Sequence, residues 1–179
     1  DYSDKDLIKN KISILRKNKD YNFNSSSFNA TKLLDNLLKT DKKLKVKKIF
    51  DNNFKINIKI DKTFLDNDNI MNNLNGYLIL KNSEIIDGNL ESFFSNNKKI
   101  KLTIRSTPNE KITTLFSDLA KPFVNRYKFI KGFEEGNLDF YSVKKNDLSN
   151  SKLIIDNFKV QEVSACLLYT SPIPRDEAL

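Results

Sequence analysis

Apolar and polar residues alternate along most of the chain between Leu44 and Val163. A period of two places every apolar side chain of a strand on one face of a β-sheet. The alternation is clearest over 54–61 and 99–105, where the apolar positions are Phe54, Ile56, Ile58, Ile60, Ile100, Leu102 and Ile104. A sheet with one oily face must cover it with a second sheet, a helix or a bound lipid. The pattern alone does not decide whether a second sheet, a helix or a lipid covers this face.

The alternating segments predict strands near 44–50, 53–61, 70–81, 84–95, 98–107, 110–116, 136–145 and 150–163. The connections between them are short and rich in Asn, Asp and Lys, which is typical of hairpin turns. In the last strand the apolar positions change from odd (Leu153, Ile155) to even (Phe158, Val160). This slip predicts a bulge or a strong twist.

Two further segments follow less regular patterns near the N-terminus. Residues 12–14 and 21–23 alternate around a turn-like stretch, Lys17–Asp20, which indicates a short hairpin. A helix over 7–15 is the alternative, because its apolar residues also share one helical face. Asn29 is a suitable N-cap for a helix ending near Lys39, whose apolar face is Ala30, Leu33, Leu34, Leu37 and Leu38.

A second short helix is predicted after the strand near 110–116. Its apolar face is Leu119, Ala120, Phe123, Val124 and Tyr127, and Pro122 restricts its start because proline lacks an N–H. With one helix inside the run of strands, a series of parallel βαβ units is not indicated. We therefore expect a mainly β fold, a curved and twisted antiparallel β-meander shaped like a groove, with two short amphipathic helices.

The net charge of +8 would suit a nucleic-acid or anionic-membrane partner. Only four of the 31 basic residues are Arg, however, and the chain holds 24 Asn. Lys, Asn, Ile and Phe all have A/T-rich codons, so an AT-rich genome accounts for this composition without a function. We expect no nucleic acid as partner. A basic nucleic-acid module stays as an alternative, and it would require Lys48, Lys55, Lys59, Lys99 and Lys101 to cluster on one surface.

Little in the chain could perform chemistry. It has no His and one Cys, which excludes histidine bases, His-ligated metals and Cys–His nucleophiles from it. We expect no enzyme, no metal and no cofactor. No run of about 20 apolar residues could span a membrane, and no signal peptide is visible. Because the chain begins with Asp1, we expect its true start, and any membrane anchor, to lie outside it.

The last residues differ from all the others. The run Cys166–Asp176 has neither Asn nor Lys and contains two of the four Pro. It resembles the translated adapter of sequencing libraries, with Ile173 as a departure. We therefore expect one domain over residues 1–165 and an adapter-derived or disordered tail over 166–179.

Three segments in the C-terminal third carry a family resemblance: Ser117–Ala120, Gly132–Phe140 and Ile155–Val163. A Ser-Asp-x-Ala helix start, a Gly-bracketed turn into a strand and a Phe-Lys-Val segment follow one another in this order. They resemble the central region of the YhdP/AsmA-like family. Residues 28–34 and 87–90 are similar but less specific.

The resemblance implies a setting and a function. Such proteins are anchored in the inner membrane of Gram-negative bacteria, cross the periplasm as repeated β-grooves, and are implicated in passing phospholipid to support the outer membrane. It implies that the seven alternating apolar residues line a groove for acyl chains. A structural or adhesive β-sandwich, in which the same face is a closed core, remains the first alternative.

Overall fold

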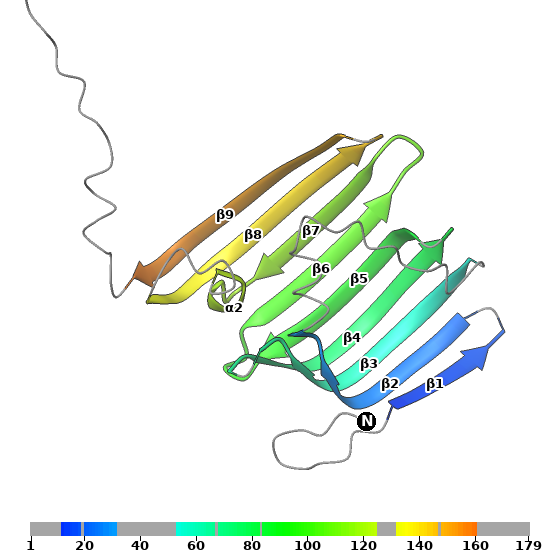
Figure 1. Cartoon of the computed structure of the whole chain (residues 1–179), viewed down its shortest axis with the longest axis horizontal. Helices are drawn as coiled ribbons and strands as arrows, with labels where there is room; N and C mark the ends of the chain where they lie inside the picture. The colour runs from blue at the N-terminus through cyan, green and yellow to red at the C-terminus, as the bar shows by residue number, and fades with distance from the viewer. Residues whose placement is uncertain are drawn as a thin grey trace, which may run out of the picture.

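The computed structural model describes residues 12–18, 20–31, 53–66, 68–82, 84–124, 132–146 and 148–160. These residues form one nine-stranded sheet, whose strands lie side by side in their order along the chain. Figure 1 shows the sheet as open and curved, with β1 and β9 at its two edges. The prediction of a mainly β, curved meander is therefore confirmed.

Most of the strands are longer than the five or six residues that are common in globular proteins. Seven of the eight strands predicted from residue 44 onward are present, and the one near 44–50 lies outside the described residues. The bounds are β1 Ile12–Lys17, β2 Asp20–Asn29, β3 Phe54–Phe64, β4 Ile70–Lys81, β5 Glu84–Phe94, β6 Lys99–Ser106, β7 Lys111–Ser117, β8 Phe133–Lys145 and β9 Leu148–Val160.

A hairpin of β1 and β2 opens the described chain. Ile14 pairs with Phe23 across a turn that contains Asn18. The predicted hairpin is confirmed, and the alternative helix is wrong over Ile12–Leu15, which belongs to β1. The short sequence fits the period of a helix and that of a strand equally well, and the pairing with β2 shows that it forms a strand.

The pair of β2 and β3 is parallel, whereas every other pair of neighbours is antiparallel. The expectation of a purely antiparallel sheet is wrong at this pair, and the sheet is mixed. Parallel neighbours cannot be joined by a tight turn and need a connection of about a dozen residues or more. The chain between Asn29 and Phe54 is long enough to provide one.

The first predicted helix falls within this connection. Asn29 Oδ1 accepts a hydrogen bond from the backbone N–H of Thr31 at 3.0 Å, which is the bond expected of a helix cap. Beyond Thr31 the predicted helix over 30–39 lies outside the described residues. The C-terminal tail over 166–179 lies outside them as well.

Asn residues take the left-handed backbone conformation at four of the hairpin turns: Asn18, Asn82, Asn97 and Asn146, with φ between 51° and 61°. Asn tolerates this region better than most residues because its short side chain bonds locally. The chain has only four Gly, so Asn supplies its tight turns. The turns predicted at 96–97 and 145–147 are confirmed at Asn97 and Asn146.

The last two strands, β8 and β9, kink at paired positions. Glu135 and Gly136 on β8 have φ of 61° and 77°, and Asn157 on β9 has φ of 52°. Beyond the kink, the ring of Phe158 stacks on that of Phe133 at a centroid distance of 5.1 Å. The slip predicted between Ile155 and Phe158 is confirmed, since a left-handed residue shifts the alternation that follows it.

One helical turn, α2 (Lys121–Val124), covers the start of β8. The Ala120 N–H donates to the carbonyl of Gly136 at 2.7 Å, and a Cβ at Gly136 would stand 3.3 Å from that of Ala120. Ala120 and Val124 are buried against Phe133 and Leu138. The predicted second helix is present over Lys121–Val124, and its remaining predicted face residue, Tyr127, lies outside the described part of the chain. In that part, no helix has the length and apolar character needed to cross a bilayer.

Candidate functional site

One row of apolar residues crosses the whole sheet from edge to edge. Directly paired residues on neighbouring strands point to the same face, so the register defines the row. Its nine members, from β1 to β9, are Ile14, Phe23, Ile58, Gly76, Leu90, Leu102, Leu115, Phe140 and Leu153. We call the face that bears this row the groove face.

The neighbouring row, one residue along each strand, points to the opposite side, which we call the outer face. From β2 to β9 it reads Asn22, Asn57, Tyr77, Asn89, Thr103, Thr114, Tyr141 and Lys152. Polar side chains join across it, as when Asn57 Nδ2 donates to Asn22 Oδ1 at 3.0 Å. One sheet therefore carries an apolar face and a largely polar face.

The groove face is hollowed into an open cavity of about 500 Å³. At one end it is bounded by a packed cluster that includes Leu65, Phe94 and, from α2, Phe123. Eighteen residues line the cavity: Phe23, Phe28, Ala30, Ile56, Ile58, Ile60, Thr63, Leu65, Met71, Leu74, Leu78, Leu90, Glu91, Ser92, Ile100, Leu102, Leu115 and Phe123. This cavity, the groove from here on, is our candidate functional site.

Five of the seven predicted lining residues border the groove: Ile56, Ile58, Ile60, Ile100 and Leu102. Phe54 and Ile104 share their face by alternation but lie outside the groove. Both are buried, with 7% and 8% of their surface exposed. The ring of Tyr21 meets that of Phe54 edge-on at 5.3 Å, so a neighbouring side chain covers Phe54.

The prediction missed lining residues on β2, β4, β5 and β7. Phe23, Leu90 and Leu115 lie in the apolar row, and the register identifies them at once. Met71 and Leu74 on β4 were hidden for another reason, because Asn73 between them has a left-handed backbone (φ 55°) and the register shifts there. This bulge lets two residues three apart face the same side.

The floor of the groove contains a glycine that makes room for a neighbour. Gly88 pairs with Leu78 across β4 and β5. A Cβ at Gly88 would stand 2.7 Å from the Leu78 Cδ2, so the leucine side chain lies over the glycine. The side chain of Leu78 therefore packs flat against the sheet at Gly88 and does not extend into the groove.

The groove has almost no charge. Glu91 is the one ionisable residue that borders it among those described. Glu91 is directly opposite Lys101, so its side chain is on the outer face, where its carboxylate is paired with the Lys99 ammonium at 2.9 Å. The Thr63 hydroxyl is buried and has no hydrogen-bond partner among the described residues, so it offers no accessible polar group. Such a lining suits hydrocarbon and would disfavour a buried ionic group.

The basic residues named for a nucleic-acid surface do not form one cluster. Lys55 and Lys59 are on β3, whereas Lys99 and Lys101 are on β6, and the two strands β4 and β5 lie between them. Glu91 lies between the two pairs, opposite Lys101 and ion-paired with Lys99. Lys48 lies outside the described residues.

A polar group on the outer face is centred on Tyr77. The Lys55 ammonium lies 4.7 Å from the centroid of the Tyr77 ring, a cation–π distance. A hydrogen bond to Asp87, together with that residue's negative charge, raises the pKa of Tyr77. These contacts are on the solvent side of the sheet and leave the groove unaffected.

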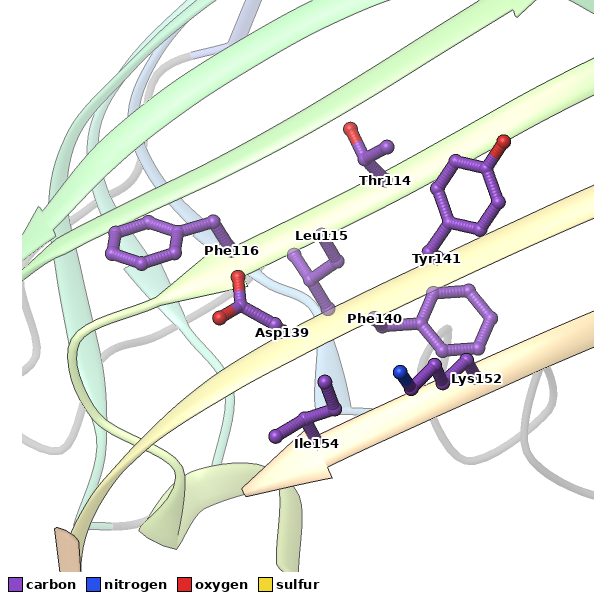
Figure 2. A pocket seen from close by; sticks show the side chains of 8 residues that line it. All are labelled: Thr114, Leu115, Phe116, Asp139, Phe140, Tyr141, Lys152 and Ile154. Carbon is purple, nitrogen blue, oxygen red and sulfur yellow. The ribbon is translucent and has the colours of Figure 1, made fainter. Parts of the chain in front are cut away.

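The outer face also has a smaller hollow of about 230 Å³ over β7, β8 and β9 (Figure 2). Three of its lining residues, Phe116, Tyr141 and Ile154, are exposed apolar or aromatic side chains. Asp139 and Lys152 lie among them, as Figure 2 shows. The outer face is therefore less uniformly polar near the β9 edge than at its centre.

The segments that carry the family resemblance lie around α2 and the kink of β8 and β9. Gly132 and Gly136 both have positive φ, and they bracket the entry into β8 as the motif implies. The motif's Ser117–Ala120 segment leads into α2. No family model, curated protein or solved structure matches the chain, so membership of the YhdP/AsmA-like family stays a prediction.

Proposed function

We propose that this chain holds lipid acyl chains in its groove and so forms a section of a path along which phospholipid passes between membranes. The observation that carries the proposal is the apolar row that crosses all nine strands and, from β2 to β7, forms part of the open groove. A row of this kind offers hydrocarbon a continuous surface that water does not interrupt.

The size of the groove supports an acyl chain as its occupant. Ligand pockets are commonly about 300–1,000 Å³, and the groove has about 500 Å³. At about 30 Å³ for a water-sized group, this is room for roughly 16 such groups, close to one acyl chain. Each buried methylene contributes about 0.8 kcal/mol, so a chain that lies in the groove is strongly favoured over one in water.

The ends of the apolar row support passage along it. Ile14 at the β1 edge is 61% exposed and Leu153 at the β9 edge is 53% exposed. The row thus reaches both open edges of the sheet, where a hydrocarbon chain can enter or continue. Because the few polar side chains of the lining are buried or already paired, none of them fixes a lipid in one place, and the mechanism is passive and needs no catalytic residue.

The resemblance to the YhdP/AsmA-like family supplies the cellular part of the proposal. On that basis the chain is a piece of an inner-membrane-anchored periplasmic protein of a Gram-negative bacterium. Its role there is to carry phospholipid toward the outer membrane. The sequence motifs alone support this setting.

Two other functions compete with lipid binding. A closed β-sandwich needs a second sheet over the groove face, and the described residues form a single sheet. A nucleic-acid surface needs contiguous cations, and Glu91 separates the lysines of β3 from those of β6. Both observations favour the lipid groove.

Photocrosslinking tests the proposal. A photoreactive residue replaces Ile58 or Leu102, which line the groove, and the full chain is incubated with phosphatidylethanolamine–phosphatidylglycerol vesicles. Lys59 and Lys101 are the matched controls, since each is adjacent to its groove residue on the same strand and points to the outer face. We expect the groove positions to capture several times more phospholipid than the controls. Equal capture at all four positions would overturn the proposal.

A further inference from the structure

The groove face changes its chemistry toward one end of β6, β7, β8 and β9. The apolar row there is Leu102, Leu115, Phe140 and Leu153. Two residues along each strand, on the same face, the row becomes Ile104, Thr113, Ser142 and Ser151. Two residues further it becomes Ser106, Lys111, Lys144 and Ser149. The face thus passes from hydrocarbon to hydroxyls to lysines.

The hydroxyls of β8 and β9 already form a small network. The Ser151 hydroxyl donates to Ser142 Oγ at 2.8 Å, and Ser142 Oγ and Ser149 Oγ are 3.2 Å apart. All three side chains are on the groove face. A hydroxyl can donate to an anionic oxygen while it accepts from its neighbour, so this network can turn donors toward a bound anion.

Lys111 and Lys144 are directly opposite each other on β7 and β8. Like charges in that arrangement are destabilising. Among the described residues neither ammonium is in an ion pair, and no carboxylate residue belongs to these three rows. In the described part of the chain, two cations are therefore held side by side on the groove face with no carboxylate paired to either.

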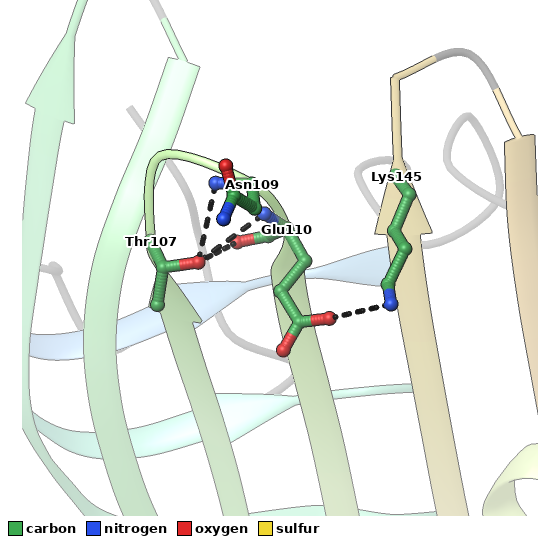
Figure 3. A network of polar contacts seen from close by, with 4 residues as sticks. All are labelled: Thr107, Asn109, Glu110 and Lys145. Carbon is green, nitrogen blue, oxygen red and sulfur yellow. Dashed lines mark hydrogen bonds and ion pairs between the residues drawn. The ribbon is translucent and has the colours of Figure 1, made fainter.

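The adjacent lysine on the outer face shows the contrast. Lys145, next to Lys144, forms an ion pair with Glu110 at 3.3 Å. Figure 3 shows this pair beside the turn that Thr107 and Asn109 form between β6 and β7. At this end of the sheet, Lys145 on the outer face thus has an ion-pair partner, whereas Lys111 and Lys144 on the groove face have none among the described residues.

We propose that Lys111, Lys144 and the serine network bind the phosphate of a lipid headgroup whose acyl chain lies in the groove. The inference rests on the proposed function and adds the charge class of its ligand, an anionic phospholipid. The charges are complementary, since two ammonium groups face a phosphate and the uncharged groove faces the hydrocarbon. Lys111 is four residues from Leu115, about 13 Å along β7, so one lipid can reach both regions.

Three probes separate headgroup from chain, each titrated into the full 179-residue chain by calorimetry. They are lysophosphatidylglycerol, lysophosphatidylcholine with the same acyl chain, and glycerol 3-phosphate, which has no chain. A basic residue near an anionic lipid surface strengthens binding by about fivefold. We expect lysophosphatidylglycerol to bind at least about fivefold tighter than lysophosphatidylcholine, and this preference to shrink as salt is added.

Paired variants locate the preference. We expect K111Q/K144Q to abolish it and to weaken lysophosphatidylcholine much less than lysophosphatidylglycerol, because the choline group offsets the charge of its phosphate. The control K145Q/K152Q removes the same charge from β8 and β9 on the outer face, and it should keep the preference. The single variant K144Q should reduce the preference for lysophosphatidylglycerol. Because the Lys144 side chain is exposed, this variant can still test the site if the double variant folds poorly.

The outcomes also separate this inference from the proposed function. Equal binding of the two lysolipids by the unaltered chain would overturn the headgroup site and leave the acyl groove standing. Binding of glycerol 3-phosphate as tight as that of lysophosphatidylglycerol would show a site for free phosphate and overturn the lipid assignment. Failure of both lysolipids to bind would overturn the groove and the headgroup site together.

Discussion

The side chain of Leu78 lies over Gly88, its partner on the neighbouring strand, with Cδ2 where only a residue without a Cβ leaves room. We expect Gly88→Ala to push Leu78 away from the sheet and into the groove. Overpacking of this kind costs about 1–2 kcal/mol in the free energy of unfolding, which urea denaturation measures. The double variant G88A/L78A should recover part of the loss. An unaltered unfolding midpoint in Gly88→Ala would contradict the close approach.

Gly76 should tolerate alanine less well than Gly88. Its φ is +141°, and an added Cβ would meet the backbone carbonyl oxygen of Asn89 instead of the end of a flexible side chain. Because neither backbone can move aside without breaking the pairing of β4 and β5, we expect Gly76→Ala to cost about 3 kcal/mol or more. The same urea series measures both variants. The opposite order of stability would show that the backbone contact is not limiting.

Thr63 and Ser92 form a contrasting pair of buried hydroxyls on the groove wall. The Thr63 hydroxyl has no hydrogen-bond partner among the described residues, whereas the Ser92 hydroxyl donates to the Asn72 carbonyl at 2.7 Å. We expect Thr63→Val to leave stability unchanged or raise it by up to about 1 kcal/mol, because it removes an unsatisfied group. Ser92→Ala should lower stability by about 1 kcal/mol, because it orphans a carbonyl. Thermal or urea unfolding compares the two, and equal losses would refute the difference.

The kink of β8 and β9 carries an ion pair whose effect depends on pH. The Lys159 ammonium donates to Glu135 at 2.8 Å, and this bond and its charge lower the pKa of Glu135 and raise that of Lys159. A carboxyl group with a lowered pKa stabilises the fold above its unfolded pKa, and this contribution is lost as the pH falls through the folded value.

We therefore expect the pKa of Glu135 to return toward its ordinary range in Lys159→Gln. Carbon NMR of the Glu side-chain carboxyl groups measures the titration directly. Because both side chains are more than half exposed, the change in global stability should be small. The same Glu135 titration in both proteins would mean that the two groups do not interact in solution.

Much of the fold was accessible from local pattern. Alternation located seven strands from β3 to β9, and the odd-to-even slip near Asn157 located the kink. These features depend on the few residues around each position, which is why a single sequence reveals them. The same reasoning named five residues that border the groove, together with Phe54 and Ile104, which do not. Phe54 contacts Tyr21, a residue from a distant part of the chain that alternation within one strand does not reveal.

Other features were inaccessible because they depend on which strands meet. The parallel pairing of β2 and β3 was missed, since parallel and antiparallel strands have the same alternation. Met71 and Leu74 were missed because a bulge at Asn73 reverses the face that a strict period of two assigns. A one-residue shift of register moves every following side chain to the other face.

By itself, the sequence determined that this protein is a series of strands with one apolar face, joined by Asn-rich turns. Only the tertiary structure decided that paired residues align into one apolar row across nine strands, that Leu78 packs over Gly88, and that Lys111 and Lys144 lie opposite each other with no ion-pair partner among the described residues. The physical reason is range. Alternation and turn chemistry act between residues close in sequence, whereas a groove and a charge cluster depend on the register between strands that the sequence keeps apart.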